Sequence, residues 1–215
     1  MNKAIYVAFM AIALTNYACT GKPDSTTIEV VGTNKVQPLI ANMEAKALRV
    51  NTATSVITWK GTKMSGMGSH SGTVKMKYGE LYIKGGQLTG GYFVADMNII
   101  RVTDIPADDV VPIRNLTNHL KIDFDVRKFP TAKFEVTKVQ YVTQEDLQVS
   151  GNLTIKDVTK NITVPVKATG KNTWYTAFRF NRFHWNIGKD GSWLEKRMVD
   201  EDVELTVLLK TEINY

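Results

Sequence analysis

The residues of this chain that could do chemistry are few and poorly placed for catalysis. Its three histidines are His70, His119 and His184, and none of them stands at metal-ligand spacing with another. Ser69 precedes His70, but neighbouring side chains in an extended segment point to opposite faces, so the two do not form a nucleophile and its base. The acidic residues are scattered, and no pair is placed for proton transfer. The sequence therefore predicts neither a metal site nor an enzyme.

Two features that could bind phosphate groups, a glycine cluster and a basic charge, both lack the required arrangement. Gly66, Gly68 and Gly72 come close to a phosphate-binding loop, but the spacing differs by one residue and no helix is predicted to follow. The formal net charge is +6, yet lysines such as Lys75 and Lys77 alternate along a predicted strand. Proteins that bind nucleic acids concentrate their basic residues on one face. We therefore expect no dinucleotide and no nucleic acid as a partner.

The first residues have the layout of an export signal. Lys3 precedes an uncharged, mostly apolar stretch over residues 4–14, and Ala18-Cys19 follows. This stretch is about half of the roughly 20 residues that a membrane-spanning helix needs, so we expect residues 1–18 to be removed. Cleavage before Cys19 would leave an acylated cysteine that anchors the protein to a membrane of the cell envelope, on the periplasmic side. The alternative is an ordinary secretory cleavage nearby.

The chain after the signal divides into a linker and one domain. Residues 19–45 are rich in Thr, Lys, Gly and Pro and have no sustained period, which predicts a flexible linker after the acylated N-terminus. Residues 46–215 are numerous enough to bury a core of their own. Cys19 is the only cysteine, so this domain must be stable without a disulfide.

The domain from 46 to 215 shows the period-two pattern of strands. In the clearest case, Val203, Leu205 and Val207 alternate with polar residues. Gly85-Gly86 predicts a two-residue hairpin turn, because such turns require positive φ angles. About eight strands are expected, over residues 55–62, 73–83, 87–97, 133–141, 147–155, 161–168, 174–185 and 203–213. Short strands joined by tight turns predict an all-β protein, an antiparallel barrel or sandwich.

One short helix is expected near residues 112–121. Ile113, Leu116 and Leu120 fall at the i, i+3 and i+7 positions of one helical face. Pro112 suits the first turn of a helix, where its missing N–H has no partner to lose. A single short helix beside a barrel is expected to act as a lid or a plug.

Several short motifs follow one another in a specific order. They are Trp59-Lys60-Gly61, Gly68-Ser69-His70-Ser71-Gly72-Thr73-Val74, Gly90-Gly91-Tyr92-Phe93, Asp96-Met97-Asn98-Ile99, His119-Leu120-Lys121, Phe129-Pro130-Thr131-Ala132-Lys133-Phe134 and Gly151-Asn152-Leu153-Thr154-Ile155-Lys156-Asp157-Val158-Thr159-Lys160. In this order they resemble the YceI-like domain family, from Leu48 to the C-terminus. The resemblance implies an exported, lipocalin-like antiparallel barrel that takes a polyisoprenoid or similar long lipid into an apolar lumen and performs no catalysis. One departure is Asn181-Arg182, which stands where Asp-Arg is common in the family.

The expected function is the binding, sequestration or transport of a long apolar lipid, a polyisoprenoid or isoprenoid quinone-like molecule, in the cell envelope. Each buried methylene contributes about 0.8 kcal/mol, so a long chain binds without specific chemistry. Aromatic and apolar side chains of the predicted strands are expected to line the lumen: Trp59, Met76, Phe93, Phe134, Ile155 and Phe178. His70, Arg114 and His119 are expected to meet a polar or phosphate head group at the barrel mouth.

Two other functions stay open at this point. The protein could be a structural or interaction lipoprotein, with a barrel filled by side chains and loops that bind another envelope protein. The more remote alternative is a metal-dependent enzyme built on the three histidines. Apart from a bound isoprenoid-type lipid no cofactor is expected, and the sequence leaves the oligomeric state open.

Overall fold

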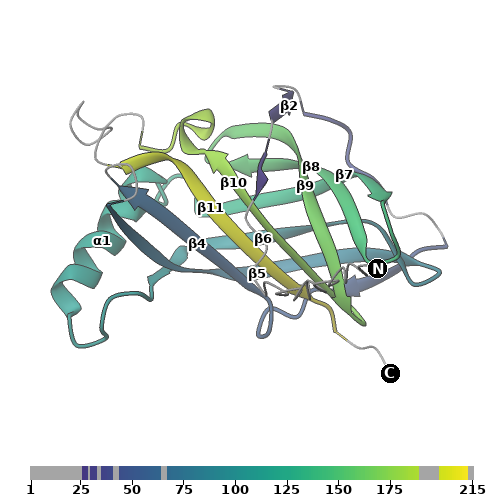
Figure 1. Cartoon of the computed structure of the whole chain (residues 1–215), viewed down its shortest axis with the longest axis horizontal. Helices are drawn as coiled ribbons and strands as arrows, with labels where there is room; N and C mark the ends of the chain where they lie inside the picture. Colours follow the sequence, from purple (N-terminus) through teal and green to yellow (C-terminus); the bar gives the residue numbers. More distant parts are fainter. Residues whose placement is uncertain are drawn as a thin grey trace, which may run out of the picture.

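An eight-stranded antiparallel barrel forms the body of the protein (Figure 1). The computed structural model describes residues 26–28, 30–32, 35–40, 44–63, 67–188 and 199–212. The barrel strands are β4 (Val56–Lys63), β5 (Gly68–Lys84), β6 (Gln87–Val102), β7 (Thr131–Tyr141), β8 (Asp146–Ile155), β9 (Val158–Gly170), β10 (Thr173–Asn181) and β11 (Val199–Lys210). Each strand pairs with the next along the chain, and the pairing of β11 with β4 closes the barrel. The predicted all-β antiparallel barrel of about eight strands is confirmed.

The up-and-down order gives the barrel two different ends. One end carries the short connections β5–β6, β7–β8 and β9–β10. Gly85 and Gly86 have φ angles of +58° and +81°, as the predicted hairpin turn requires. The opposite end, here called the helix end, carries the β8–β9 turn, the β10–β11 connection and the helix α1 (Val110–Asp123) between β6 and β7. The predicted short helix is therefore present and is longer by two residues at each side.

Burial decides which face of each strand is inside. In β4, Ile57 and Trp59 are buried, whereas Val56 is exposed. Val207 and Leu209 of the neighbouring β11 are buried as well, at the alternate positions that the period-two pattern predicts. The inward-pointing residues of all eight barrel strands form one continuous apolar core.

The alternation predicted one strand over residues 174–185, but the structure has two elements there. Strand β10 ends at Asn181, and the 3-10 helix η1 (Arg182–Trp185) follows. The Asn181 side chain accepts a hydrogen bond from the N–H of Phe183 at 2.9 Å, which caps this helix. Trp185 is fully buried, and its Nε1 donates to the carbonyl oxygen of Leu153. The prediction of a strand was therefore wrong for residues 182–185, which include His184. The cap at Asn181 and the bond from Trp185 to Leu153 favour a 3-10 helix over the strand that local alternation predicts.

The described parts of the expected flexible linker are paired with the barrel. Strand β1 (Thr26–Thr27) pairs in parallel with β10, and β2 (Val30–Gly32) pairs with β9. The strands β9 and β10 pair with each other only between Lys167–Gly170 and Thr173–Tyr175. The two N-terminal strands therefore cover edges that would otherwise leave backbone groups unpaired. A further short strand, β3 (Lys46–Arg49), pairs with β5.

Asn152 connects the N-terminal segment to the barrel wall. It is 0% exposed, its Oδ1 accepts from the N–H of Val36 at 3.1 Å, and its Nδ2 donates to the Val36 carbonyl at 2.6 Å. Its Oδ1 also accepts from Asn161 Nδ2 at 3.1 Å. The Asn152 amide thus pairs with the N–H and the carbonyl of Val36 as the backbone of a neighbouring strand would.

Replacing Asn152 with alanine is expected to lower the free energy of unfolding by about 1–3 kcal/mol, because the part-buried backbone groups of Val36 lose their partner and the buried Asn161 amide keeps only Thr137. Urea denaturation measures this loss, and limited proteolysis is expected to cut the N-terminal segment faster. The matched control is Gln148→Ala, at an exposed position of the same strand. Equal stability of the two variants would contradict the role of Asn152.

Candidate functional site

The barrel encloses a cavity of about 210 Å³. All eight barrel strands and the C-terminal end of α1 contribute to its walls, and most of the lining side chains are aliphatic or aromatic. A water molecule needs roughly 10–15 Å³ of such space and two or more polar partners. The cavity is therefore far larger than a packing defect, and its walls suit an apolar molecule better than water.

Five of the six side chains that were predicted to face a ligand line this cavity. They are Trp59, Phe93, Phe134, Ile155 and Phe178. The rings of Phe93 and Phe134, on paired strands, stack with 5.5 Å between centroids. Met76 is 1% exposed but does not line the cavity, and the β5–β6 register shifts between Met76 and Tyr78. Contact of these side chains with a ligand stays a prediction.

The three head-group candidates lie at the helix end of the barrel, outside the cavity lining. His70 is near the start of β5, where its Nδ1 lies 3.1 Å from Oδ2 of Asp104. Arg114 is exposed on α1. His119, one helical turn before Asp123, places its Nε2 3.4 Å from Oδ2 of that residue. The fold brings the three to one end of the barrel, and their contact with a head group stays a prediction.

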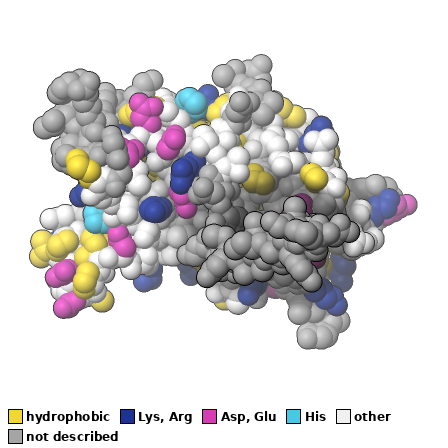
Figure 2. Space-filling model, viewed as in Figure 1, with side chains coloured by type: hydrophobic (Ala, Val, Ile, Leu, Met, Phe, Trp, Pro, Cys, Tyr) yellow, Lys and Arg dark blue, Asp and Glu magenta, His cyan; other side chains and the backbone are white. Residues whose placement is uncertain are grey.

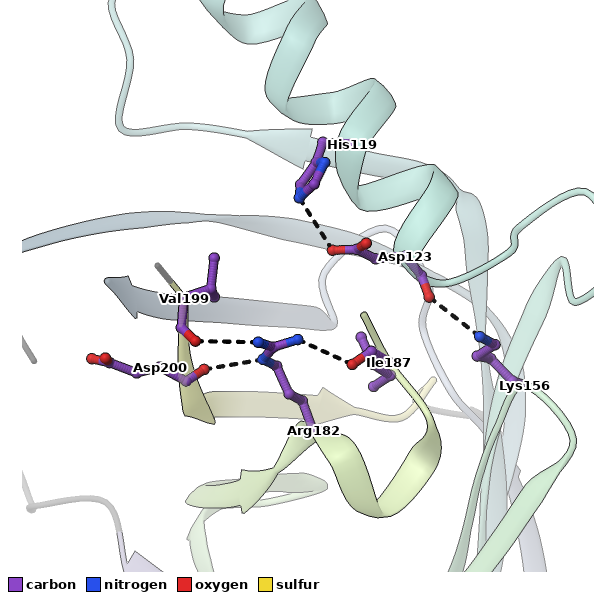
Figure 3. Close-up of polar contacts among 7 residues, drawn as sticks. All are labelled: His119, Asp123, Lys156, Arg182, Ile187, Val199 and Asp200. Carbon is purple, nitrogen blue, oxygen red and sulfur yellow. Dashed lines mark hydrogen bonds and ion pairs between the residues drawn. The ribbon is translucent and has the colours of Figure 1, made fainter. Parts of the chain in front are cut away.

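Sequence reasoning missed Arg182, the buried cation of the cavity wall. Arg182 is 5% exposed, and it lines the cavity at the helix end. Its guanidinium donates to three carbonyl oxygens, from Nε to Asp200 at 3.1 Å, from Nη1 to Ile187 at 3.1 Å and from Nη2 to Val199 at 3.2 Å (Figure 3). Burial lowers the pKa of Arg182, while the charges of Asp123 and Glu201 act in the opposite direction. The side chain ties η1 to the start of β11.

Asp123 also belongs to the lining, whose charged residues are Asp123, Lys133 and Arg182. It is the last residue of α1, and its backbone carbonyl accepts from Lys156 Nζ at 3.4 Å (Figure 3). Lys156, in the turn between β8 and β9, also donates to the carbonyl of Asn186 at 3.1 Å. These contacts hold the end of α1 over the helix end of the cavity. The sequence signal for Arg182 was the motif Asn181-Arg182, and no local pattern links it to Asp123.

The surface around α1 combines apolar and charged side chains. Figure 2 shows hydrophobic side chains gathered over α1 beside acidic ones, and Val110, Val111 and Ile122 are among the exposed residues. Among the described residues, no group of three or more His, Cys, Asp or Glu could hold a metal ion. No helix in the same part of the chain is long and apolar enough to cross a membrane.

The chain matches the model of the YceI-like domain over residues 48–211. It belongs to the YceI-like family. The match covers the whole barrel, from the end of β3 to the residue after β11, and agrees with the motifs noted in the sequence. None of the curated proteins matches the sequence at a significant level.

Two proteins are among the solved structures that are similar to this chain. BcnA of Burkholderia cenocepacia superimposes with a TM-score of 0.62 at 20% identity, and the match covers 74% of this chain and 98% of that one. The YceI protein of Campylobacter jejuni gives a TM-score of 0.48 at 16% identity, over 95% of this chain and 100% of that one. At these identities, the likeness to BcnA shows the barrel fold.

Proposed function

We propose that this YceI-like protein binds a long apolar lipid of the isoprenoid type inside its barrel and sequesters or carries it in the cell envelope, without catalysis. The observation that supports this proposal is the apolar cavity of about 210 Å³ at the barrel centre. Each methylene that moves from water into it contributes about 0.8 kcal/mol. A barrel filled by its own side chains, as the interaction-lipoprotein alternative requires, would leave no such space.

The helix α1 acts in this proposal as the lid of the cavity. Leu120 and Phe124 line the cavity from the end of α1. No residue of α1 is fully buried, so the helix is held by half-buried side chains, Ile113 and Leu116 included, and by the hydrogen bond from Lys156 to the carbonyl of Asp123. A lipid longer than the cavity would leave the barrel at this end, between α1 and the polar cluster of Asp123 and Arg182.

The proposed location is the periplasmic side of the envelope, with the membrane contact made by acylated Cys19. Both Cys19 and the signal sequence 1–18 lie outside the described residues. Thr26 is already paired with β10. The seven chain steps from Cys19 to Thr26 span at most about 25 Å at the extension limit of a polypeptide. An acylated Cys19 would therefore hold the barrel close to the membrane surface.

Native mass spectrometry of the full mature chain, isolated from its own cells and followed by organic extraction, tests this function. We expect a stoichiometric lipid of the isoprenoid type, released together with a return to the mass of the chain alone. A stable protein that is isolated empty and takes up no added isoprenoid would instead favour the interaction lipoprotein. The full mature chain is required because Thr26, Val30 and Val36 form hydrogen-bonded pairs with the barrel.

A further inference from the structure

The barrel wall is split between β9 and β10. The structure describes both strands over their whole length, and they pair directly only between Lys167–Gly170 and Thr173–Tyr175, next to the short connection that joins them. Beyond these pairs, Thr176 Oγ1 donates to the Pro165 carbonyl at 2.6 Å. That carbonyl faces β10, so the N–H that proline lacks is missing on the side where the ladder would have to continue. From Pro165 toward the helix end, each strand therefore presents a free edge to the other.

The N-terminal residues 26–28 and 30–32, here called the strap, occupy this split (Figure 1). Strand β1 pairs with residues 178–179 on the free edge of β10, and β2 pairs with residues 161–162 on the facing edge of β9. The other edges of β9 and β10 are taken by β8 and β11. Both strands of the strap therefore lie inside the split.

The strands on both sides of the split line the apolar cavity. Val164 and Val166 of β9 and Phe178 of β10 belong to the lining. Ile28 and Val30 of the strap are half-buried and pack against the apolar core. The strap lies before the residues that match the family model, which begin at 48. The side wall of the cavity is therefore completed by a segment that this chain adds to the family domain.

We propose that the split is a side portal through which the bound lipid enters and leaves the cavity, and that the strap closes it. This inference rests on the proposed function and adds the route of exchange to it. The strap is easily released, because it pairs with the barrel over two short strands and Thr26 and Thr27 are exposed. A paired strand takes about 4.8 Å of the split, about the width of an extended hydrocarbon chain. A long chain can therefore enter sideways, without being threaded through the end of the barrel.

The first test links the strap to β10 by a disulfide, whose formation is verified by thiol titration. Thr27→Cys and Arg179→Cys change two paired, exposed positions, in a full mature chain with Cys19→Ser. The protein is loaded with radiolabelled geranylgeraniol, and its transfer to phosphatidylcholine vesicles is measured. We expect transfer from the oxidised protein to be at least about 10-fold slower than from the same protein after reduction, because local opening is blocked. The matched control is the pair Arg49→Cys and Glu80→Cys, which links β3 to β5 and is expected to give equal rates in both states.

The second test weakens the strap. Ile28→Ala with Val30→Ala removes apolar carbon atoms from two half-buried side chains, which is expected to speed transfer about 10- to 30-fold. The matched control, Thr26→Ala with Thr27→Ala, changes exposed positions of the same strap and is expected to leave the rate unchanged. A transfer rate that the disulfide does not change would overturn the portal and leave the helix end as the route. If the wild-type protein takes up no geranylgeraniol, the proposed function itself is overturned, and the inference with it.

Discussion

Replacing Arg182 with methionine is expected to lower the free energy of unfolding by about 3–5 kcal/mol. The guanidinium is the hydrogen-bond donor for the carbonyls of Asp200, Ile187 and Val199, and methionine keeps much of its apolar stem but none of these donors. Each carbonyl left buried without a partner costs about 1–3 kcal/mol, less where water can reach it. Chemical denaturation of the purified protein measures the loss.

The control for this variant is Arg179→Met. Arg179 is 45% exposed in its side chain, and its Nη2 lies 3.3 Å from Glu204 Oε2. An exposed ion pair of this kind contributes up to about 1 kcal/mol, so the control is expected to lose less than that. An Arg182 variant as stable as the Arg179 variant would show that the three carbonyls find other partners. Arg182 would then not be needed to hold η1 against the start of β11.

Replacing Gly61 with leucine is expected to lower the affinity for the lipid about 5- to 140-fold, and the lipid content of the isolated protein with it, while the barrel stays folded. Gly61 lines the cavity, and a Cβ at this position would meet no atom within 4 Å. The new side chain therefore enters the cavity instead of the wall. Overpacking against a ligand costs about 1–3 kcal/mol, and each 1.4 kcal/mol is tenfold in affinity. Native mass spectrometry of the extracted lipid gives the occupancy.

Gly170→Leu is the matched control for Gly61→Leu. A Cβ at Gly170 also meets no atom within 4 Å, but this residue ends β9 and does not line the cavity. We expect its lipid content to equal that of the wild type. Full occupancy in the Gly61 variant would mean that the lipid binds elsewhere than in this cavity, whereas loss of lipid in both variants would indicate a general effect of the substitution.

The departure at Asn181 changes a polar contact without changing the role of the position. The Asn181 side chain accepts from Phe183 N–H, as an aspartate could, and its Nδ2 donates to Glu201 Oε2 at 2.8 Å. The second contact needs a donor, which aspartate lacks. The Asn therefore caps η1 and also binds the strand β11, next to the carbonyls that Arg182 holds.

The sequence by itself determined most of the barrel strands, the hairpin turn at Gly85-Gly86 and the family. Alternation at Val203, Leu205 and Val207 and the glycine pair at 85–86 are local features, which depend on side-chain direction and backbone φ within a few residues. The order of the motifs from Trp59 onward then selected a barrel of the YceI-like kind, which the match over residues 48–211 confirms.

The tertiary structure alone decided what surrounds the barrel interior. Period two defines two faces of each strand, and only closure through the β11–β4 pairing shows that Trp59 and Phe178 face the same cavity. Thr26 pairs with β10, which is far from it in the chain. Arg182 binds Val199, on the other side of the irregular connection between η1 and β11. Such contacts depend on where the unpaired strand edges and carbonyl groups of the closed barrel lie. A local pattern of residue types does not contain the positions of these groups.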